Sequence, residues 1–217
     1  MPEGKIIERM LDGRRAAARI SCAANFVPAP GQYLLAHLPA SDDPLAVAVF
    51  SAGVSADGFL AASSLPSAWT AGAALSLRGP LGRGFAIPAN ARRVALAVWD
   101  VSPAYLLGLI PLAEKQGADL VLLCNDPPED IPSDVEIRPL AALDEIAQWA
   151  DYLALAASRA GWRERVHERA RLKVTREAQA LIVTPMPCGG LAQCGVCSVE
   201  VGKGSWLACE DGPVFSL

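Results

Sequence analysis

The stretch Cys188-Gly-Gly-Leu-Ala-Gln-Cys194-Gly-Val-Cys197 decides how the C-terminal part of this chain folds. It carries three thiols, and a fourth thiol follows at Cys209. Three clustered cysteines and one distant cysteine are the spacing of a ferredoxin-type [2Fe–2S] site. The glycines between the cysteines allow the tight turns that a loop around such a group needs. Since the surrounding segment has few apolar residues, we expect bound metal to hold it folded.

The same spacing leaves other assignments of the four thiols open. Five residues separate Cys188 from Cys194, one more than in plant-type ferredoxins and the spacing seen in adrenodoxin-like ferredoxins. Structural zinc sites usually show two separated Cys-x-x-Cys pairs, and this chain has one. We therefore expect a [2Fe–2S] cluster, with structural zinc, or free thiols or disulfides, as alternatives. Cys22 and Cys124 lie in apolar stretches and are expected to be buried without chemical consequence.

Composition limits the class of protein. The chain has 217 residues, 52% of them hydrophobic and 19% charged, which suits one large or two small compact domains. The net charge of −4 argues against general nucleic-acid binding. No apolar run approaches the length of a membrane span, and the first residues lack the apolar core of a signal peptide. Cysteines in a cluster pattern fit a reducing compartment, so we expect a cytoplasmic protein.

Residues 1–88 predict an antiparallel barrel or sandwich. Short strand-like runs alternate with turn-forming segments such as Pro28–Gly31 and Ser55–Gly58. The expected strands are Ala16–Ser21, Gln32–His37, Ala46–Phe50, Phe59–Ser63 and Ala74–Leu77.

From Arg92 onward the pattern changes to that of a parallel α/β sheet. Val94–Trp99 and Leu120–Cys124 are continuous apolar runs, which is typical of strands buried on both faces. Helical spacing over Pro103–Gln116 and Leu140–Trp149 alternates with them, which predicts right-handed crossovers. Further strands are expected at Val135–Arg138, Tyr152–Ala156 and Ala180–Val183.

A basic stretch and the histidines are further candidates for function. Residues 159–176 hold seven basic side chains against Glu164 and Glu168, which indicates either a solvated helix face or a docking face for an acidic partner. The two histidines, His37 and His167, are expected to be structural or solvated. No catalytic constellation is expected.

The order of these parts resembles the electron-transfer subunit of class B dihydroorotate dehydrogenase, in the ferredoxin-reductase-like superfamily. The resemblance spans nearly the whole chain. The stretches that carry it are Pro30–Tyr33 (PGQY), Arg78–Phe85 (RGPLGRGF), the cysteine loop, and Cys209–Phe215 (CEDGPVF), the most specific of the four.

The resemblance implies three parts: a flavin-domain-like antiparallel β-barrel at 1–88, a Rossmann-like, NAD-domain-like α/β domain at 91–183, and a [2Fe–2S] module at 184–217. Its metal ligands would be Cys188, Cys194, Cys197 and Cys209. In the family, such a subunit carries FAD and [2Fe–2S], takes hydride from NADH, and passes electrons to the flavin of a catalytic subunit.

The chain departs from the family pattern at three places, all concerned with nucleotides. Ala48 stands where the family has an arginine that holds the flavin phosphates, and alanine cannot neutralise phosphate. The first α/β turn, Val98–Pro103, lacks the expected glycines and carries Asp100, which would repel phosphate. Leu155–Arg159 retains none of the family's Cys-Gly-Pro segment. NAD(H) binding is therefore not expected, and FAD binding stays open.

Three glycines would take part in flavin binding if FAD is retained. Gly79, Gly82 and Gly84 lie in the loop that borders the flavin in relatives. Their alternative role is a turn that closes the barrel.

Together these observations predict an electron-transfer subunit of an oxidoreductase complex. It would relay single electrons through a [2Fe–2S] cluster to or from a catalytic or flavin-containing subunit, without hydride chemistry of its own. The cysteine loop and the basic stretch would be its docking surfaces. One alternative is a conventional FAD- and [2Fe–2S]-containing, NADH-dependent reductase subunit of dihydroorotate dehydrogenase. Another is a structural or regulatory subunit whose metal only holds the C-terminal module folded.

Overall fold

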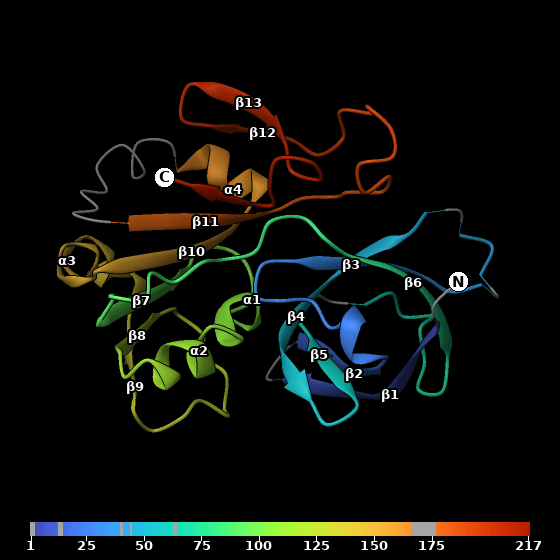
Figure 1. The fold of residues 1–217 in the computed structure, drawn as a ribbon, viewed down its shortest axis with the longest axis horizontal. Helices are drawn as coiled ribbons and strands as arrows, with labels where there is room; N and C mark the ends of the chain where they lie inside the picture. The colour runs from blue at the N-terminus through green and yellow to red at the C-terminus, as the bar shows by residue number, and fades with distance from the viewer. Residues whose placement is uncertain (1–2, 13–14, 40, 44, 63–64, 166–176) are drawn as a thin grey trace.

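The computed structural model describes residues 3–12, 15–39, 41–43, 45–62, 65–165 and 177–217. Within them the chain forms a closed β-barrel beside a six-stranded sheet, with a two-stranded hairpin above the sheet (Figure 1). None of the helices in these ranges is long and apolar enough to cross a membrane.

The barrel is antiparallel throughout, with the strand order β1-β2-β5-β4-β3-β6. It confirms the antiparallel β-barrel expected in the first part of the chain. Its core combines branched apolar side chains such as Ile6, Ile20 and Val49 with the aromatic Phe59 and Trp69. Its strands are β1 (Glu3–Asp12), β2 (Arg15–Ser21), β3 (Tyr33–His37), β4 (Val47–Ser55), β5 (Gly58–Ala61) and β6 (Ala74–Leu81), with a short helix η1 (Ala24–Phe26) after β2.

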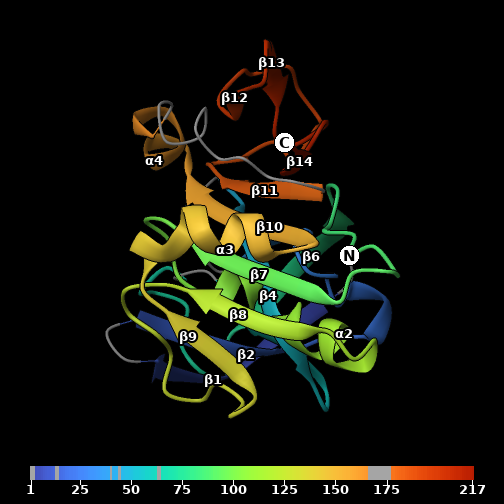
Figure 2. The ribbon, with the colours of Figure 1, turned by 90° about the vertical axis from the view of Figure 1, so that its left-hand side faces the viewer.

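The second unit is a parallel sheet with one antiparallel edge. Its order is β14-β11-β10-β7-β8-β9, and Figure 2 looks onto it with β10, β7, β8 and β9 in succession. All pairs are parallel except β11 with β14. The strands are β7 (Arg93–Val98), β8 (Asp119–Leu123), β9 (Val135–Arg138), β10 (Tyr152–Ser158), β11 (Glu177–Val183) and β14 (Val214–Ser216). The sheet confirms the predicted Rossmann-like α/β arrangement.

Short helices connect these strands. They are α1 (Ala104–Leu107), α2 (Ile110–Lys115), η2 (Leu140–Ala142), α3 (Leu143–Trp149) and α4 (Arg159–Glu164). The single helix predicted over Pro103–Gln116 is instead two short helices, with a break at Gly108–Leu109. At the break the chain lies against the barrel, since a Cβ added to Gly108 would be 3.2 Å from the Pro30 ring. Pro111 lies in the first turn of the second helix and cannot continue the hydrogen bonding of α1, so the single predicted helix is divided here.

The C-terminal segment returns to the sheet after leaving it. A loop follows β11, the hairpin of β12 (Ser198–Val201) and β13 (Gly204–Leu207) comes next, and β14 then pairs with β11. The β14 strand had not been expected, and neither had β1.

Candidate functional site

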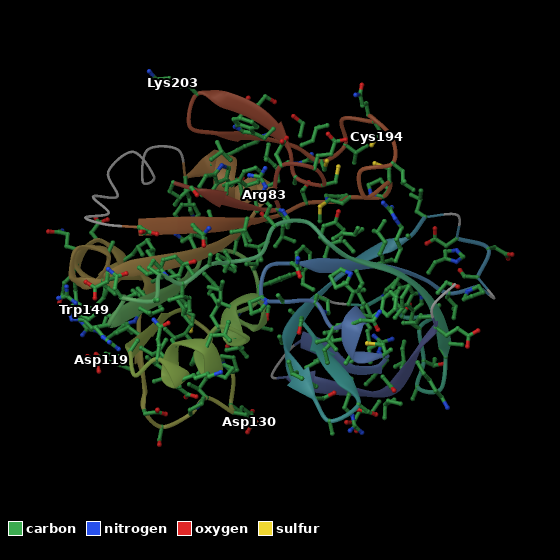
Figure 3. The ribbon with its side chains drawn as sticks, in the orientation of Figure 1. Arg83, Asp119, Asp130, Trp149, Cys194 and Lys203 are labelled. Atoms are coloured by element: carbon green, nitrogen blue, oxygen red, sulfur yellow. The ribbon has the colours of Figure 1, made fainter. Side chains whose placement is uncertain are left out.

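Four cysteines from two segments come together beside the barrel. Cys188 and the exposed Cys194 lie in the loop after β11, while the buried Cys197 and Cys209 flank the hairpin. Figure 3 shows Cys194 on the outer part of this loop, on the barrel side of the molecule. The glycines of the loop, at 189, 190 and 195, have φ of 52°, 82° and 70°. Other residues rarely adopt this left-handed region, so the turns expected from the sequence are present.

The thiols are arranged as two close pairs. The Cys188 and Cys194 sulfurs are 3.7 Å apart, and the Cys197 and Cys209 sulfurs are 3.2 Å apart. The two pairs lie near each other, since Cys209 is among the groups that lower the pKa of Cys188. All four sequence-predicted ligands are thus in one place.

The environment shifts the pKa values of two of these thiols in opposite directions. Backbone hydrogen bonding at Ala192, with a smaller contribution at Gly190, lowers the pKa of Cys188 to about 7. Burial, followed by interactions with Cys197 and Cys188, raises the pKa of Cys209 to about 12. A metal that needs Cys209 as a thiolate would therefore have to displace its proton on binding.

In the described part of the chain, no group of three or more His, Cys, Asp or Glu side chains has an arrangement that could hold a metal ion. The four thiols approach one another in pairs instead.

The barrel holds the cysteine loop through Arg78. Its guanidinium donates hydrogen bonds to the carbonyl oxygens of Cys188 at 3.1 Å and Gly189 at 2.9 Å. The loop lies so close to the barrel that a Cβ on Gly189 would be 2.4 Å from Leu35. A larger residue at position 189 would require the Leu35 side chain to move, which adds a packing cost to the positive φ.

Tyr33 of β3 reaches the same place from the barrel. Its side chain is fully buried, and its hydroxyl has no hydrogen-bond partner among the described residues. Burial raises the pKa of Tyr33, and the charges of Cys209 and Cys197 raise it further. Sequence reasoning missed Tyr33 and Arg78 as site residues. Tyr33 is the last residue of the Pro30–Tyr33 stretch, and Arg78 is the first of the Arg78–Phe85 stretch, both of which carry the family resemblance.

The three glycines that would border a flavin pack against protein. A Cβ on Gly82 would be 2.5 Å from the Pro213 ring, and one on Gly84 would be 2.8 Å from the Pro30 carbonyl oxygen. Gly79 has φ of 140°, with the Tyr33 carbonyl oxygen 3.1 Å from its added Cβ. The turn at the end of β6 thus explains these glycines without a ligand.

Asp100 occupies the point where the strand order of the sheet reverses. In such sheets ligands bind outside the carboxyl ends of the strands at this point, here between β7 and β10. The Asp100 carboxylate accepts a 2.8 Å hydrogen bond from the Ser158 backbone N–H and a second from the Ser158 hydroxyl. A Cβ on Gly161 would lie 2.5 Å from the same carboxylate. A carboxylate of the protein therefore fills the position where a dinucleotide phosphate would be expected.

Aromatic and basic side chains pack around Asp100 at the same end of the sheet. The Trp99 and Trp162 rings lie 5.8 Å apart, and the Arg165 guanidinium lies 5.6 Å from the Trp99 ring. Trp162 also donates to the Glu200 carbonyl oxygen of β12 at 2.8 Å, and Arg159 donates to the Val196 carbonyl oxygen. Two of the seven basic residues therefore make internal contacts.

The rest of the basic stretch, residues 166–176 including His167, lies outside the described residues. His37 places Nε2 2.9 Å from the Asp43 carbonyl oxygen. Cys124 is buried as expected, whereas Cys22 is only half-buried.

The position of the missing arginine lies in a paired strand. Ala48 pairs with Leu35 across β3 and β4. Two residues on, the buried Phe50 ring lies 5.7 Å from Tyr33 and 5.3 Å edge-on from Tyr105 of α1. Aromatic side chains from both units thus meet where the barrel adjoins the sheet.

No protein-family model matches the chain, and no curated protein matches it. Solved structures do match over most of its length. An NADH-dependent reduced ferredoxin–NADP oxidoreductase, studied for flavin-based electron bifurcation, has a TM-score of 0.77 at 17% identity over 98% of this chain and 87% of its own. The ferredoxin reductase of carbazole 1,9a-dioxygenase has a TM-score of 0.64 at 18% identity over 81% of this chain. This chain spans 66% of that reductase, slightly less than two thirds.

A third similar structure is phthalate dioxygenase reductase, described as a modular structure for electron transfer from pyridine nucleotides to [2Fe–2S]. Its TM-score is 0.58 at 13% identity, and the match covers 85% of this chain and 69% of that one. At these identities the likeness identifies the fold: an antiparallel barrel with a parallel α/β sheet, as in ferredoxin-reductase-like proteins.

Proposed function

We propose that this chain is an electron-transfer subunit of an oxidoreductase complex and that Cys188, Cys194, Cys197 and Cys209 hold a [2Fe–2S] cluster. When bound, such a cluster accepts and releases single electrons. The chain's own residues position the cluster beside the barrel and leave Cys194 exposed. Electrons would then pass between the cluster and a partner docked over this loop.

The observation that carries the proposal is the division of the thiols into two pairs. Two thiolates bound at about 2.3 Å to one tetrahedral metal ion are about 3.8 Å apart. The Cys188–Cys194 sulfur distance of 3.7 Å fits this geometry. The Cys197–Cys209 sulfur distance of 3.2 Å is shorter, and a small rotation of either side chain would bring it to the same value. Two pairs suit two irons, each with two cysteine ligands.

The contacts at the switch point of the sheet favour a relay over a reductase that uses nicotinamide. Asp100, Trp99 and Trp162 fill the end of the β7–β10 crevice with protein contacts. These residues do not fit a dinucleotide phosphate, because a carboxylate repels it. The glycines and Ala48 offer no cation to a flavin phosphate either.

The partner that we propose is a catalytic subunit that contains a flavin. The family resemblance of the terminal Cys209–Phe215 stretch favours a complex of the dihydroorotate dehydrogenase kind. Copurification of the untagged partner with this chain from its source would test that assignment.

The second candidate function is the conventional FAD-containing, NADH-dependent reductase subunit. The fold comparisons favour it, since the similar proteins are described as a ferredoxin–NADP oxidoreductase and a ferredoxin reductase. The third candidate function is that of a structural or regulatory subunit. In that case no electron donor should be able to reduce the bound metal.

One preparation decides among these functions. The protein is purified without oxygen, and iron, acid-labile sulfide, zinc and flavin are measured on the same sample. We expect two irons and two sulfides per chain, and no flavin. Cys194→Ser should abolish the visible absorbance, while the control Cys22→Ser, at a half-buried thiol outside the loop, should keep it.

Other outcomes contradict the proposal. Zinc in place of iron, or an unchanged spectrum in Cys194→Ser, removes the ligand assignment. Stoichiometric flavin would support the conventional reductase subunit instead, and NADH-dependent reduction of a dye acceptor would complete that case.

A further inference from the structure

Strand β3 presents different residues to two different cores. Leu34 and Ala36 belong to the core inside the barrel. Tyr33 and Leu35 belong to the larger core that also contains Cys197 and Cys209. Since alternate residues of a strand point to opposite faces, Tyr33 and Leu35 share the outer face. Leu35 contacts the cysteine loop at Gly189, and Tyr33, on the same face of β3, lies against Gly82.

Packing fixes the direction of the Tyr33 ring. Phe50 lies against it at 5.7 Å between ring centroids. On the loop that follows β6, a Cβ added to Gly82 would be 3.0 Å from Tyr33 Cε1, so the ring leaves no room for a side chain there. The ring, held between Phe50 and the turn at Gly82, is fully buried.

The hydroxyl at the end of this ring is buried and has no partner among the described residues. Buried hydroxyl groups in folded proteins almost always have a hydrogen-bond partner, because an unsatisfied one costs free energy. The groups that act on Tyr33 electrostatically are the thiols Cys209, Cys197 and Cys188, and Arg78. No thiol of the described residues accepts a hydrogen bond from this hydroxyl. Because Cys197 and Cys209 belong to the same buried core as Tyr33, sulfur of a group bound to these thiols would be a nearby acceptor.

We infer that the Tyr33 hydroxyl donates a hydrogen bond to sulfur of the [2Fe–2S] group held by the four cysteines and thereby raises its reduction potential. The inference rests on the proposed function. The barrel would thus supply the residue that sets the potential, while the C-terminal segment supplies the ligands.

The direction of the effect follows from charge. Reduction adds one negative charge to the cluster and its sulfurs, so a hydrogen bond to sulfur is stronger in the reduced state. A donor that binds the reduced state more tightly raises the potential, and hydrogen bonds to sulfur are among the known determinants of cluster potentials. Removing the donor should therefore lower the potential.

Tyr33→Phe tests this because it removes only the hydroxyl. The measurement is an anaerobic redox titration of the intact chain, followed by the electron paramagnetic resonance signal of the reduced form. We expect the equilibrium constant for one-electron reduction to fall about tenfold, which corresponds to about 59 mV. Tyr105→Phe is the matched control, since it removes the hydroxyl of the other tyrosine that packs on Phe50 and should leave the potential unchanged.

A second variant keeps the test decisive if Tyr33→Phe fails to fold. Difluorotyrosine at position 33 keeps the shape of the ring and makes its hydroxyl a stronger donor, so the potential should rise. A loaded Tyr33→Phe protein with the wild-type potential, or a fluorinated protein with no shift, overturns the inference while leaving the proposed function intact. If wild-type protein purified without oxygen contains neither iron nor sulfide, the proposed function itself is wrong.

Discussion

The two hydrogen bonds from Arg78 to the cysteine loop allow a prediction with a magnitude. Arg78→Met keeps much of the apolar stem but removes both donors to the Cys188 and Gly189 carbonyl oxygens. Hydrogen bonds from a charged group contribute about 1.5–3 kcal/mol each. Because the contact is only partly buried, water replaces some of this. We therefore expect the free energy of opening the loop to fall by about 2 kcal/mol.

Hydrogen exchange measures this loss locally. The Gly189 amide donates to the Met186 carbonyl oxygen, and the Leu191 amide donates to the Cys188 carbonyl oxygen that Arg78 also binds. Loss of about 2 kcal/mol makes exchange of these amides roughly 30-fold faster. The experiment uses metal-free, reduced full-length protein, in which bound metal does not hold the loop.

Arg83→Met is the matched control for the loss of an arginine. The Arg83 side chain is exposed, and its link to the C-terminal segment is a backbone hydrogen bond from its N–H to the Gly212 carbonyl oxygen, which the substitution keeps. Figure 3 shows Arg83 between the barrel and the sheet. Equal exchange rates in Arg78→Met and Arg83→Met would refute the view that Arg78 anchors the loop.

Two further predictions concern the switch point and the thiols. Gly161→Ala places a Cβ 2.5 Å from the Asp100 carboxylate, so it should lower the free energy of unfolding by about 1–3 kcal/mol. The control Gly53→Ala meets no atom within 4 Å and should change it little. Equal melting temperatures of the two variants would contradict the packing at Asp100. In metal-free protein, alkylation of Cys188 should be half-maximal near pH 7 and slow as pH falls below it, because its pKa is lowered to about 7 and the thiolate is the nucleophile. Cys22, whose pKa is raised by burial and then by Asp57, should need pH above 9, and equal pH profiles by peptide mass spectrometry would refute the assignment.

The buried sheet was the most predictable part of the fold. The apolar run Val94–Trp99 differs from β7 by one residue at each end, because a strand buried on both faces needs uninterrupted apolar residues. Strand β1 could not be found in the same way, since Glu3–Asp12 mixes charged and apolar residues and is held by pairing with β2 and β6. Only three residues form β14, and their pairing with β11 depends on a return of the chain from far along the sequence.

The approach of the four thiols was predictable from the sequence, and the residues around them were not. Cysteine spacing is local, so four thiols could be assigned together from sequence. The contacts of Arg78 with Cys188 and Gly189 span 110 and 111 residues, and no local pattern indicates them. The glycines at the end of β6 show a different limit of sequence-based prediction. Close packing against protein and close approach to a ligand both require glycine, so the residue type alone does not distinguish them.

The altered nucleotide turn and the intact cysteine loop are physically connected. Asp100, at the end of β7, binds Ser158, the residue that caps α4. From α4, Trp162 and Arg159 donate to carbonyl oxygens of Glu200 and Val196, on either side of the start of the hairpin. A glycine-rich turn at this point would provide neither the carboxylate nor the Trp99 ring that packs on Trp162. The residues that depart from a glycine-rich nucleotide turn are therefore the same residues that support the cysteine segment, and this connection is what the proposed relay without a nicotinamide site would require.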